Sequence, residues 1–465
     1  MDRHLLALTL ALMLGIGGCS KDQQRIAAPD ARAGSRLAMN VLVDPDGRET
    51  FWSFHDTALG TDCSFRTAAD GVLRCLPFAH ATSQAGLLYQ GTCTNLPGCV
   101  RTGGTEYPFI RLPADSTCPE RWRVFKAGAL VPNQGLGWAH HRPDGVCEAI
   151  PSMAVVRCVA PGDEIPPERF VAAVESGGAA DADLQLRELR AEDGAWAIAG
   201  ARDLHTDTAC RPEPDAVGTL RCLPATRAVV EPSFFSDGAC SVPIERLPAS
   251  WGGCAPPVAF ATATLDCRRR SRVFELGAPT SLGSIAFPQQ CVPGYWPFFL
   301  DLYWSVGAEI PPTAPIVGEQ TERGSRLRPI SHVLAGTTVP GDAWEDTALG
   351  IRCQPGLAAD GVYRCLPLYE STGTADSTVF ADRDCTIPLA WADGCAPKYA
   401  ADYLGTYYAI GAPHTGDAYA RGPSLTCEVT TYRPAEAVGA AVAFVTTGVV
   451  PSSTFVQFRQ ELRTR

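Results

Sequence analysis

Four short segments of the sequence carry side chains that could bind a metal ion, an anion or a sugar. Residues 44–47, Asp-Pro-Asp-Gly, begin like a calcium-binding loop, but the later oxygen ligands and the terminal glutamate of such a loop are missing. His140 and His141 are adjacent, so on a strand they would point to opposite faces and make a poor joint metal site. We therefore predict a tight hairpin turn at 44–47 and a solvated loop at the histidines, and we expect no metal and no cofactor.

The other two segments are basic and aromatic. Residues 268–272, Arg-Arg-Arg-Ser-Arg, could hold a phosphate or an acidic sugar through bidentate guanidinium contacts, although an exposed hairpin tip is our prediction. Residues 295–304 contain six aromatic side chains and could form a platform for a sugar. They align with the plain aliphatic residues 153–156 of an earlier part of the chain, which favours a buried strand.

Catalytic motifs are missing from the sequence. There is no Gly-x-Ser-x-Gly elbow, no His-Glu-x-x-His, no phosphate-binding glycine loop and no Ser-x-x-Lys. A carboxylate pair for glycoside hydrolysis needs only to meet in space, so the sequence does not locate one. We expect a protein without catalytic residues.

Composition excludes several other classes of protein. The 465 residues include 39 Lys+Arg and 50 Asp+Glu, for a formal net charge of −11, which argues against nucleic acid as a partner. The 38 prolines leave little room for long helices, because proline removes a helical hydrogen-bond donor. An apolar fraction of 46% is enough to bury a large core.

The 19 cysteines divide into one near the N-terminus and 18 others. An even number in an exported chain indicates disulfides, and the lack of any Cys-x-x-Cys argues against zinc. Three pairs are each twelve residues apart and flank a predicted hairpin turn, so we expect them to be bridged: Cys63 with Cys75, Cys210 with Cys222, and Cys353 with Cys365.

The remaining cysteines are paired here by their order along the chain. This gives Cys93 with Cys99, Cys118 with Cys147, Cys240 with Cys254, Cys267 with Cys291, and Cys385 with Cys395. Cys158 and Cys427 are left over. We predict that these two, or a reshuffled pair of Cys427 and another cysteine of the first repeat, connect the first and last parts of the chain.

A unit of about 145 residues occurs three times. Residues 56–77 return as 346–367 with 15 of 22 positions identical, and a looser copy ends at Pro224. The matching segments place the units at 36–180, 181–325 and 326–465. The last unit matches the others only as far as Phe458, and the first begins with an additional segment near 37–43, an offset that would let the two ends of the chain meet.

Each unit is predicted to be made of short strands. Residues 37–43 and 49–52 alternate around the turn at 44–47, and residues 184–190 are assigned to a strand because their counterpart in the third unit contains Pro329. We expect an all-β fold stapled by disulfides. Six sheets closing into a six-bladed β-propeller would protect their edges, and tandem β-sandwich or barrel domains are the alternative.

The first 35 residues differ from the rest of the chain. Residues 1–18 have a basic start, a short apolar run and small residues at the end, as in a signal peptide. Residues 16–19, Ile-Gly-Gly-Cys, resemble the bacterial lipoprotein box, which implies a lipid on Cys19 and a flexible tether over 19–35. The serine at 20 favours the outer over the inner membrane of a bacterial envelope.

The repeated Asp-Gly-x-x-Arg-Cys-Leu-Pro motif resembles that of predicted lipoproteins in myxobacteria, for which no activity is known. This resemblance bears on location and architecture alone. We expect a lipid-anchored envelope or cell-surface protein that acts as a non-catalytic scaffold, with the membrane and an unknown protein or glycan as partners. The alternative is a surface hydrolase acting on polysaccharide.

Overall fold

A computed structural model describes residues 31–464 apart from short gaps. The gaps are at 79, 82–86, 91–98, 102–107, 115–120, 131–137, 142–146, 151–157, 226–227, 248–257, 266–267, 281–283, 288–289, 294–301, 369–371, 394–396, 403–404, 422–425 and 431–440. The described elements are strands, with short 3-10 turns at Pro167–Arg169 and Ser452–Thr454. The all-β prediction is confirmed, including the strand assigned to residues 184–190.

The first half of each repeat forms one four-stranded antiparallel meander, so the chain contains three. Meander 1 contains β2 (Leu37–Val43), β3 (Glu49–Asp56), β4 (Thr61–Thr67) and β5 (Leu73–Pro77). Meander 2 contains β15 (Leu184–Ala191), β16 (Trp196–Asp203), β17 (Thr208–Pro214) and β18 (Leu220–Pro224). Meander 3 contains β27 (Leu327–Leu334), β28 (Thr337–Asp346), β29 (Ile351–Leu357) and β30 (Tyr363–Pro367).

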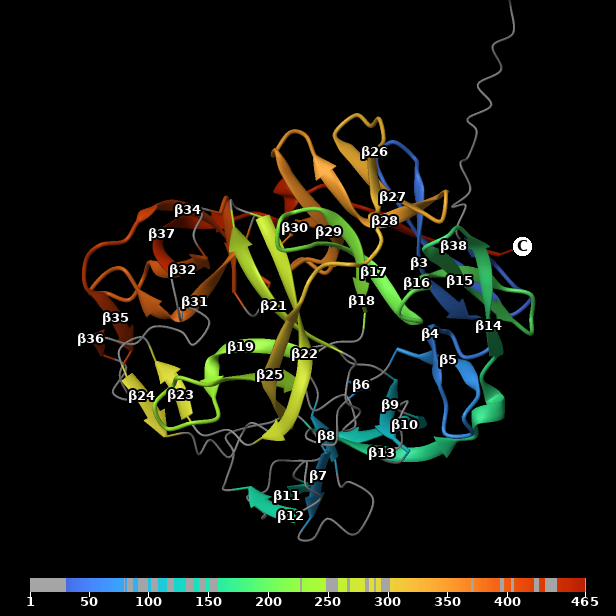
Figure 1. Cartoon of the computed structure of the whole chain (residues 1–465), viewed down its shortest axis with the longest axis horizontal. Helices are drawn as coiled ribbons and strands as arrows, with labels where there is room; N and C mark the ends of the chain where they lie inside the picture. The colour runs from blue at the N-terminus through green and yellow to red at the C-terminus, as the bar shows by residue number, and fades with distance from the viewer. Residues whose placement is uncertain are drawn as a thin grey trace, which may run out of the picture.

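Each meander gains a further edge strand. β14 (Ala172–Ala180) lies beside β15 and β26 (Gly318–Thr321) lies beside β27. The same place in meander 1, beside β2, is taken by β38 (Arg459–Arg463) from the far end of the chain. The two ends of the chain therefore meet in one sheet, as the offset between the repeats predicted, and the C-terminus lies beside the blue strands in Figure 1.

The second half of each repeat forms an outer sheet, and these sheets occupy the left and lower parts of Figure 1. The first contains β6 (His80–Ala81), β7 (Leu87–Gln90), β8 (Cys99–Arg101), β9 (Phe109–Pro113), β10 (Trp122–Leu130), β11 (Trp138–His141), β12 (Cys147–Ile150) and β13 (Cys158–Ile165). The second contains β19 (Ala228–Phe235), β20 (Pro243–Leu247), β21 (Val258–Leu265), β22 (Arg268–Thr280), β23 (Ser284–Phe287), β24 (Gln290–Pro293) and β25 (Leu302–Ile310). The third contains β31 (Thr372–Phe380), β32 (Pro388–Asp393), β33 (Tyr399–Ala401), β34 (Tyr407–Pro413), β35 (Ala418–Arg421), β36 (Cys427–Thr430) and β37 (Ala441–Val450).

The sheets do not have the equal sizes that six propeller blades would require. Within the described residues they contain 11, 8, 7, 5 and 7 strands. The largest sheet arises because β14 pairs with β5 as well as with β15, which fuses meanders 1 and 2, while β1 (Ala31–Arg32) pairs with β16. Packed β-sheets of the sandwich or barrel kind, the alternative to a propeller, are compatible with this arrangement.

The apolar core lies where one meander packs against the next. Each of three buried clusters contains one hairpin disulfide and side chains of the neighbouring meander: Cys63–Cys75 with Ala197, Cys210–Cys222 with Val339, and Cys353–Cys365 with Leu42. The meanders therefore contact one another in a cyclic order. Each disulfide stabilises the fold by about 2–4 kcal/mol, because it restricts the unfolded chain.

The repeated Asp-Gly-x-x-Arg-Cys motif has a structural role. In meander 1 the Arg74 guanidinium donates to the Asp70 carboxylate at 2.9 Å and to the backbone oxygen of Phe170 at 2.9 Å. Gly71 has φ +79°, which glycine adopts without a steric cost. The arginine thus connects the hairpin turn to the segment at Phe170, where the chain comes back from the outer sheet. Arg364 makes the same contacts with Asp360 and Phe455. Arg221 makes corresponding contacts with Ala314 and with Asp215, which lies six residues before the arginine instead of four.

The three disulfides between cysteines twelve residues apart are confirmed. The prediction for Cys385 is wrong, because it is bonded to Cys427 and not to Cys395. Cys427 begins β36, which pairs with β35, and β35 pairs with β31, the strand that ends shortly before Cys385. The proposed bridge between Cys158 and Cys427 is therefore also wrong.

The other predicted disulfides extend beyond the described side chains. Each of them includes at least one cysteine whose side chain is not described: Cys93 with Cys99, Cys118 with Cys147, Cys240 with Cys254, and Cys267 with Cys291. Cys240 itself is disulfide-bonded. Cys19 lies before the first described residue.

Candidate binding groove

An open groove of about 600 Å³ lies between meander 1 and meander 3. Meander 3 contributes Leu357 and Tyr363 to its wall. The side chains from meander 1 and the chain after it are Trp52, His55, Thr61, Asp62 and Phe78. The groove exists because the cyclic packing brings β29 and β30 against β3 and β4, although these strands are far apart in the sequence.

A β-bulge directs Trp52 toward this groove. Asn40 lies opposite Ser53 and Val41 lies opposite Phe51, so Trp52 is the additional residue on β3. A β-bulge interrupts the regular alternation of side chains along a strand, so it changes the direction in which side chains near the additional residue point. Phe51 accordingly packs in the cluster shared with meander 2, whereas Trp52 packs in the cluster shared with meander 3. The Trp52 and Tyr363 rings meet edge to face, with centroids 5.7 Å apart.

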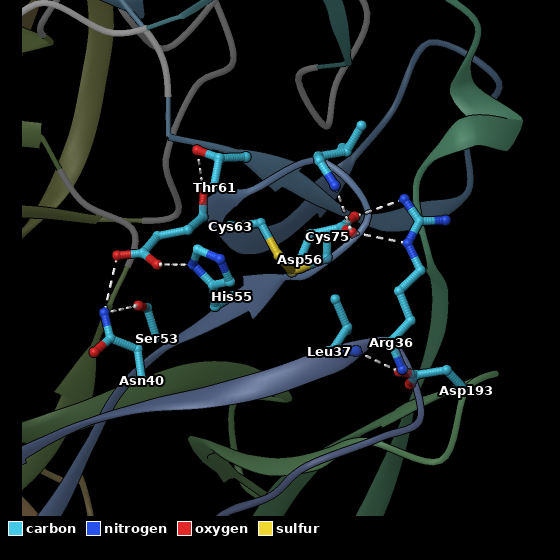
Figure 2. Close-up of a disulfide and its surroundings, with 12 residues drawn as sticks. Arg36, Leu37, Asn40, Ser53, His55, Asp56, Thr61, Cys63, Cys75 and Asp193 are labelled. Atoms are coloured by element: carbon cyan, nitrogen blue, oxygen red, sulfur yellow. Dashed lines mark hydrogen bonds and ion pairs between the residues drawn. A yellow bond between two sulfur atoms is a disulfide. The ribbon is translucent and has the colours of Figure 1, made fainter. Parts of the chain in front are cut away.

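A hydrogen-bond network lies behind the groove. The Nδ1 atom of His55 is 2.8 Å from Asp62 Oδ1, and the Asn40 side-chain amide donates to Asp62 Oδ2 at 2.9 Å. Asn40 is fully buried, and its amide also lies 3.3 Å from the Ser53 hydroxyl. Figure 2 shows Asn40, Ser53 and His55 together on one side of the Cys63–Cys75 disulfide. Both carboxylate oxygens of Asp62 are thereby held in fixed positions.

The repeats supply an internal control for this constellation. His55 and Asp62 face each other across β3 and β4, where meander 2 has Arg202 and Ala209 and meander 3 has Glu345 and Arg352. The same hairpin therefore folds with other residues at both positions, and neither histidine nor aspartate is required there by the meander itself.

The aromatic residues of the groove are also specific to it. Counted back from the aspartate that ends the second strand, Trp52 corresponds to Ala199 and Asp342 in the other meanders. Tyr363 corresponds by distance from the hairpin cysteine to Leu73 and Leu220. The fold accepts small, acidic or aliphatic residues at these places, so the meander itself does not require the aromatic pair there.

The turn predicted at residues 44–47 is confirmed. The Gly47 amide donates to the Asp44 backbone oxygen at 3.0 Å, and the Asp46 carboxylate accepts bonds from Ser325 in the segment before meander 3. Among the described residues there is no group of three side chains suited to hold a metal ion. His140 and His141 are in β11 rather than in the predicted loop.

The basic and aromatic segments belong to the second outer sheet. Arg268 lies opposite Leu265 at the end of a hairpin, as predicted, but the following residues continue into β22, where Arg272 is paired with Glu309. Of residues 295–304 the described ones are in β25, and Tyr303 and Trp304 are buried, in agreement with the prediction of a buried strand. Neither segment lines the groove.

No sequence motif pointed to the groove residues. Trp52, His55 and Asp62 belong to no motif of known chemistry, and Tyr363 comes from a different repeat. A position-by-position comparison of the three copies would have given a signal, because it shows where one copy departs from the others.

The fold and the groove define a disulfide-stapled all-β repeat protein with one distinctive junction between its repeats. The chain belongs to the family described as "Family of unknown function (DUF7481)", whose model matches residues 12–444. No curated protein and no solved structure matches it. In the described part of the chain we find no helix with the length and apolarity that crossing a membrane requires.

Proposed function

We propose that this chain is a lipid-anchored, non-catalytic binding protein of the bacterial cell envelope, and that its ligand binds in the groove between meanders 1 and 3. One observation carries the proposal. Of the three equivalent junctions, this one combines Trp52 and Tyr363 with the buried network around Asp62, at positions where the fold accepts other residues. Concave sites with aromatic walls and a few fixed polar groups are typical of ligand binding.

The state of Asp62 supports binding rather than hydrolysis. A catalytic carboxylate in a glycosidase must reach the scissile bond or a water molecule, and it acts together with a second carboxyl group. Asp62 is the one carboxylate among the described residues of the groove wall, so no second carboxyl group lies beside it there.

Binding is tested with residues 20–465, the chain without the lipid-bearing Cys19, prepared with its disulfides intact and immobilised on a sensor surface. Envelope-type oligosaccharides and peptides are passed over the surface, recovered and analysed by mass spectrometry. We expect saturable binding and unchanged probes. Cleaved oligosaccharides would favour the hydrolase instead.

The anchor is tested separately by labelling cells with palmitate and separating their membranes. We expect the wild-type chain to carry the label and to sediment with the membranes, because the lipoprotein box ends at Cys19. The Cys19→Ser variant should carry no label and leave the membrane fraction. A variant that stays with the membranes would show that the anchor is not the lipid.

A further inference from the structure

We infer that the ligand of the groove is a neutral carbohydrate, an inference that rests on the proposed binding function and specifies the ligand class. Two properties of the groove lead to this ligand: angled aromatic surfaces, and polar groups that combine hydrogen bonding with a negative charge. The residues that supply these two properties differ at the equivalent positions of the other two meanders.

The aromatic walls suit the C–H faces of a sugar ring. The planes of Trp52 and Tyr363 are inclined at 69°, and Phe78 adds a third ring to the wall. The face of an aromatic ring carries a partial negative charge, so it attracts the weakly positive C–H groups of a pyranose. Rings held at an angle can contact two sides of one sugar unit.

The polar groups suit hydroxyl groups. The side chains of His55 and Asp62 are 21% and 24% exposed, so each keeps a surface that a ligand can reach. A sugar hydroxyl both donates and accepts hydrogen bonds, and it can therefore pair with a carboxylate and with an imidazole. Asn40 and His55 fix the Asp62 carboxylate before the ligand arrives, which reduces the entropy lost on binding.

The charge of the groove disfavours acidic ligands. Its described wall contains Asp62 and no lysine or arginine, and the whole chain has a net charge of −11. A phosphate, a uronic acid or an acidic peptide would meet a negative charge without a cation to pair with it. Neutral oligosaccharides avoid this repulsion and still use the carboxylate as a hydrogen-bond acceptor.

The experiment compares three kinds of probe on the same protein. The chain of residues 20–465 is tested on an array of neutral gluco-, manno- and galacto-oligosaccharides, oligogalacturonates, and uncharged peptides. The strongest neutral probe is then titrated by calorimetry. We expect neutral oligosaccharides to bind. Trp52→Ala and Asp62→Asn should each weaken this binding about tenfold or more, as expected for central contacts of a binding site.

Trp196→Ala is the matched control, because Trp196 is a partly exposed tryptophan of meander 2 outside the groove. It should bind as the wild type does. Near-ultraviolet circular dichroism and intact disulfides show that each variant is folded. Tyr363→Leu, which introduces the residue type of the other two meanders, serves as the groove variant if Trp52→Ala fails this check.

The outcomes separate the ligand class from the proposed function. Trp52-dependent binding of oligogalacturonates or peptides, without binding of neutral sugars, would overturn the carbohydrate inference but leave the binding function. Neutral-sugar binding that is unchanged by both groove variants would overturn the groove as the site. No binding of any probe would overturn the inference and remove the support for the binding function as well.

Discussion

Val41 of β2 lies directly opposite Glu461 of β38, so the first strand of meander 1 is paired with the last strand of the chain. In meanders 2 and 3 the equivalent edge strands, β14 and β26, pair with the strands that follow them directly in the sequence. β38 instead pairs with a strand from the opposite end of the chain. The pairing covers an edge whose side chains include the fully buried Leu42. An uncovered strand edge of this kind invites pairing with another chain.

Deletion of residues 459–465 should therefore lower the thermal midpoint and produce oligomers. The deletion removes β38 and leaves the backbone groups of β2 unpaired. Calorimetry and size-exclusion chromatography with light scattering measure the two effects. Deletion of residues 464 and 465 alone is the control, because it leaves the strand intact. A monomer of unchanged stability after the longer deletion would contradict the closing role of β38.

Arg36→Ala should destabilise the fold through the partner that it leaves behind. The Arg36 guanidinium binds both carboxylate oxygens of Asp56, at 2.8 and 2.7 Å, and the Asp56 side chain is fully buried. Removal of the cation leaves a buried negative charge, and we expect a loss of about 2 kcal/mol in the free energy of unfolding.

The control for this variant is Arg328→Ala. Arg328 and Glu345 are 3.7 Å apart and both largely exposed, so their pair contributes at most about 1 kcal/mol. Urea unfolding followed by tryptophan fluorescence compares the two variants. Equal losses would show that burial of Asp56 does not matter.

Cys427→Ser should release the thiol of Cys385. The two cysteines are bonded to each other across a separation of 42 residues. Alkylation of the folded variant under non-reducing conditions, followed by peptide mass spectrometry, should label Cys385, which stays unlabelled in the wild type. A label on Cys158 instead would restore the bridge between the first and last repeats that the sequence suggested.

Asp237 should contribute to the acid dependence of stability. Its carboxylate accepts bonds from the Ser241 hydroxyl and from the Ser241 and Val242 amides, which lowers its pKa from 3.8 to about 2. A lowered pKa means that the folded state favours the ionised form. The stabilisation is therefore present above the unfolded pKa of 3.8 and is lost as the pH falls toward about 2.

Thermal midpoints of the wild type and of Asp237→Asn test this pH dependence. We expect the wild type to be more stable at neutral pH and the difference to shrink below pH 4, where the carboxylate becomes protonated in the unfolded state. Glu345→Gln, at an exposed side chain, should show no comparable change. A difference between wild type and Asp237→Asn that is constant down to pH 2 would contradict the role of the Asp237 charge.

The sequence by itself determined the local structure. Alternating apolar residues and Asp-Gly turns placed the meander hairpins, and cysteines twelve apart were bridged because a hairpin brings its two strands together whatever lies around it. The threefold repeat followed in the same way from self-similarity. The hairpins and their disulfides depend on residues that are close in the sequence, so the amino-acid sequence of one protein is enough to predict them.

Tertiary structure alone decided which distant strands become neighbours. The order of cysteines suggested short-range pairs, but β31 and β35 bring Cys385 to Cys427. β14 joins meanders 1 and 2 in one sheet, so the sheets are not the equal blades of a propeller. The cyclic packing of the meanders places Tyr363 against Trp52. Pairing between sheet edges and packing between sheet faces depend on the summed fit of many residues, and no single motif in this sequence encodes that fit.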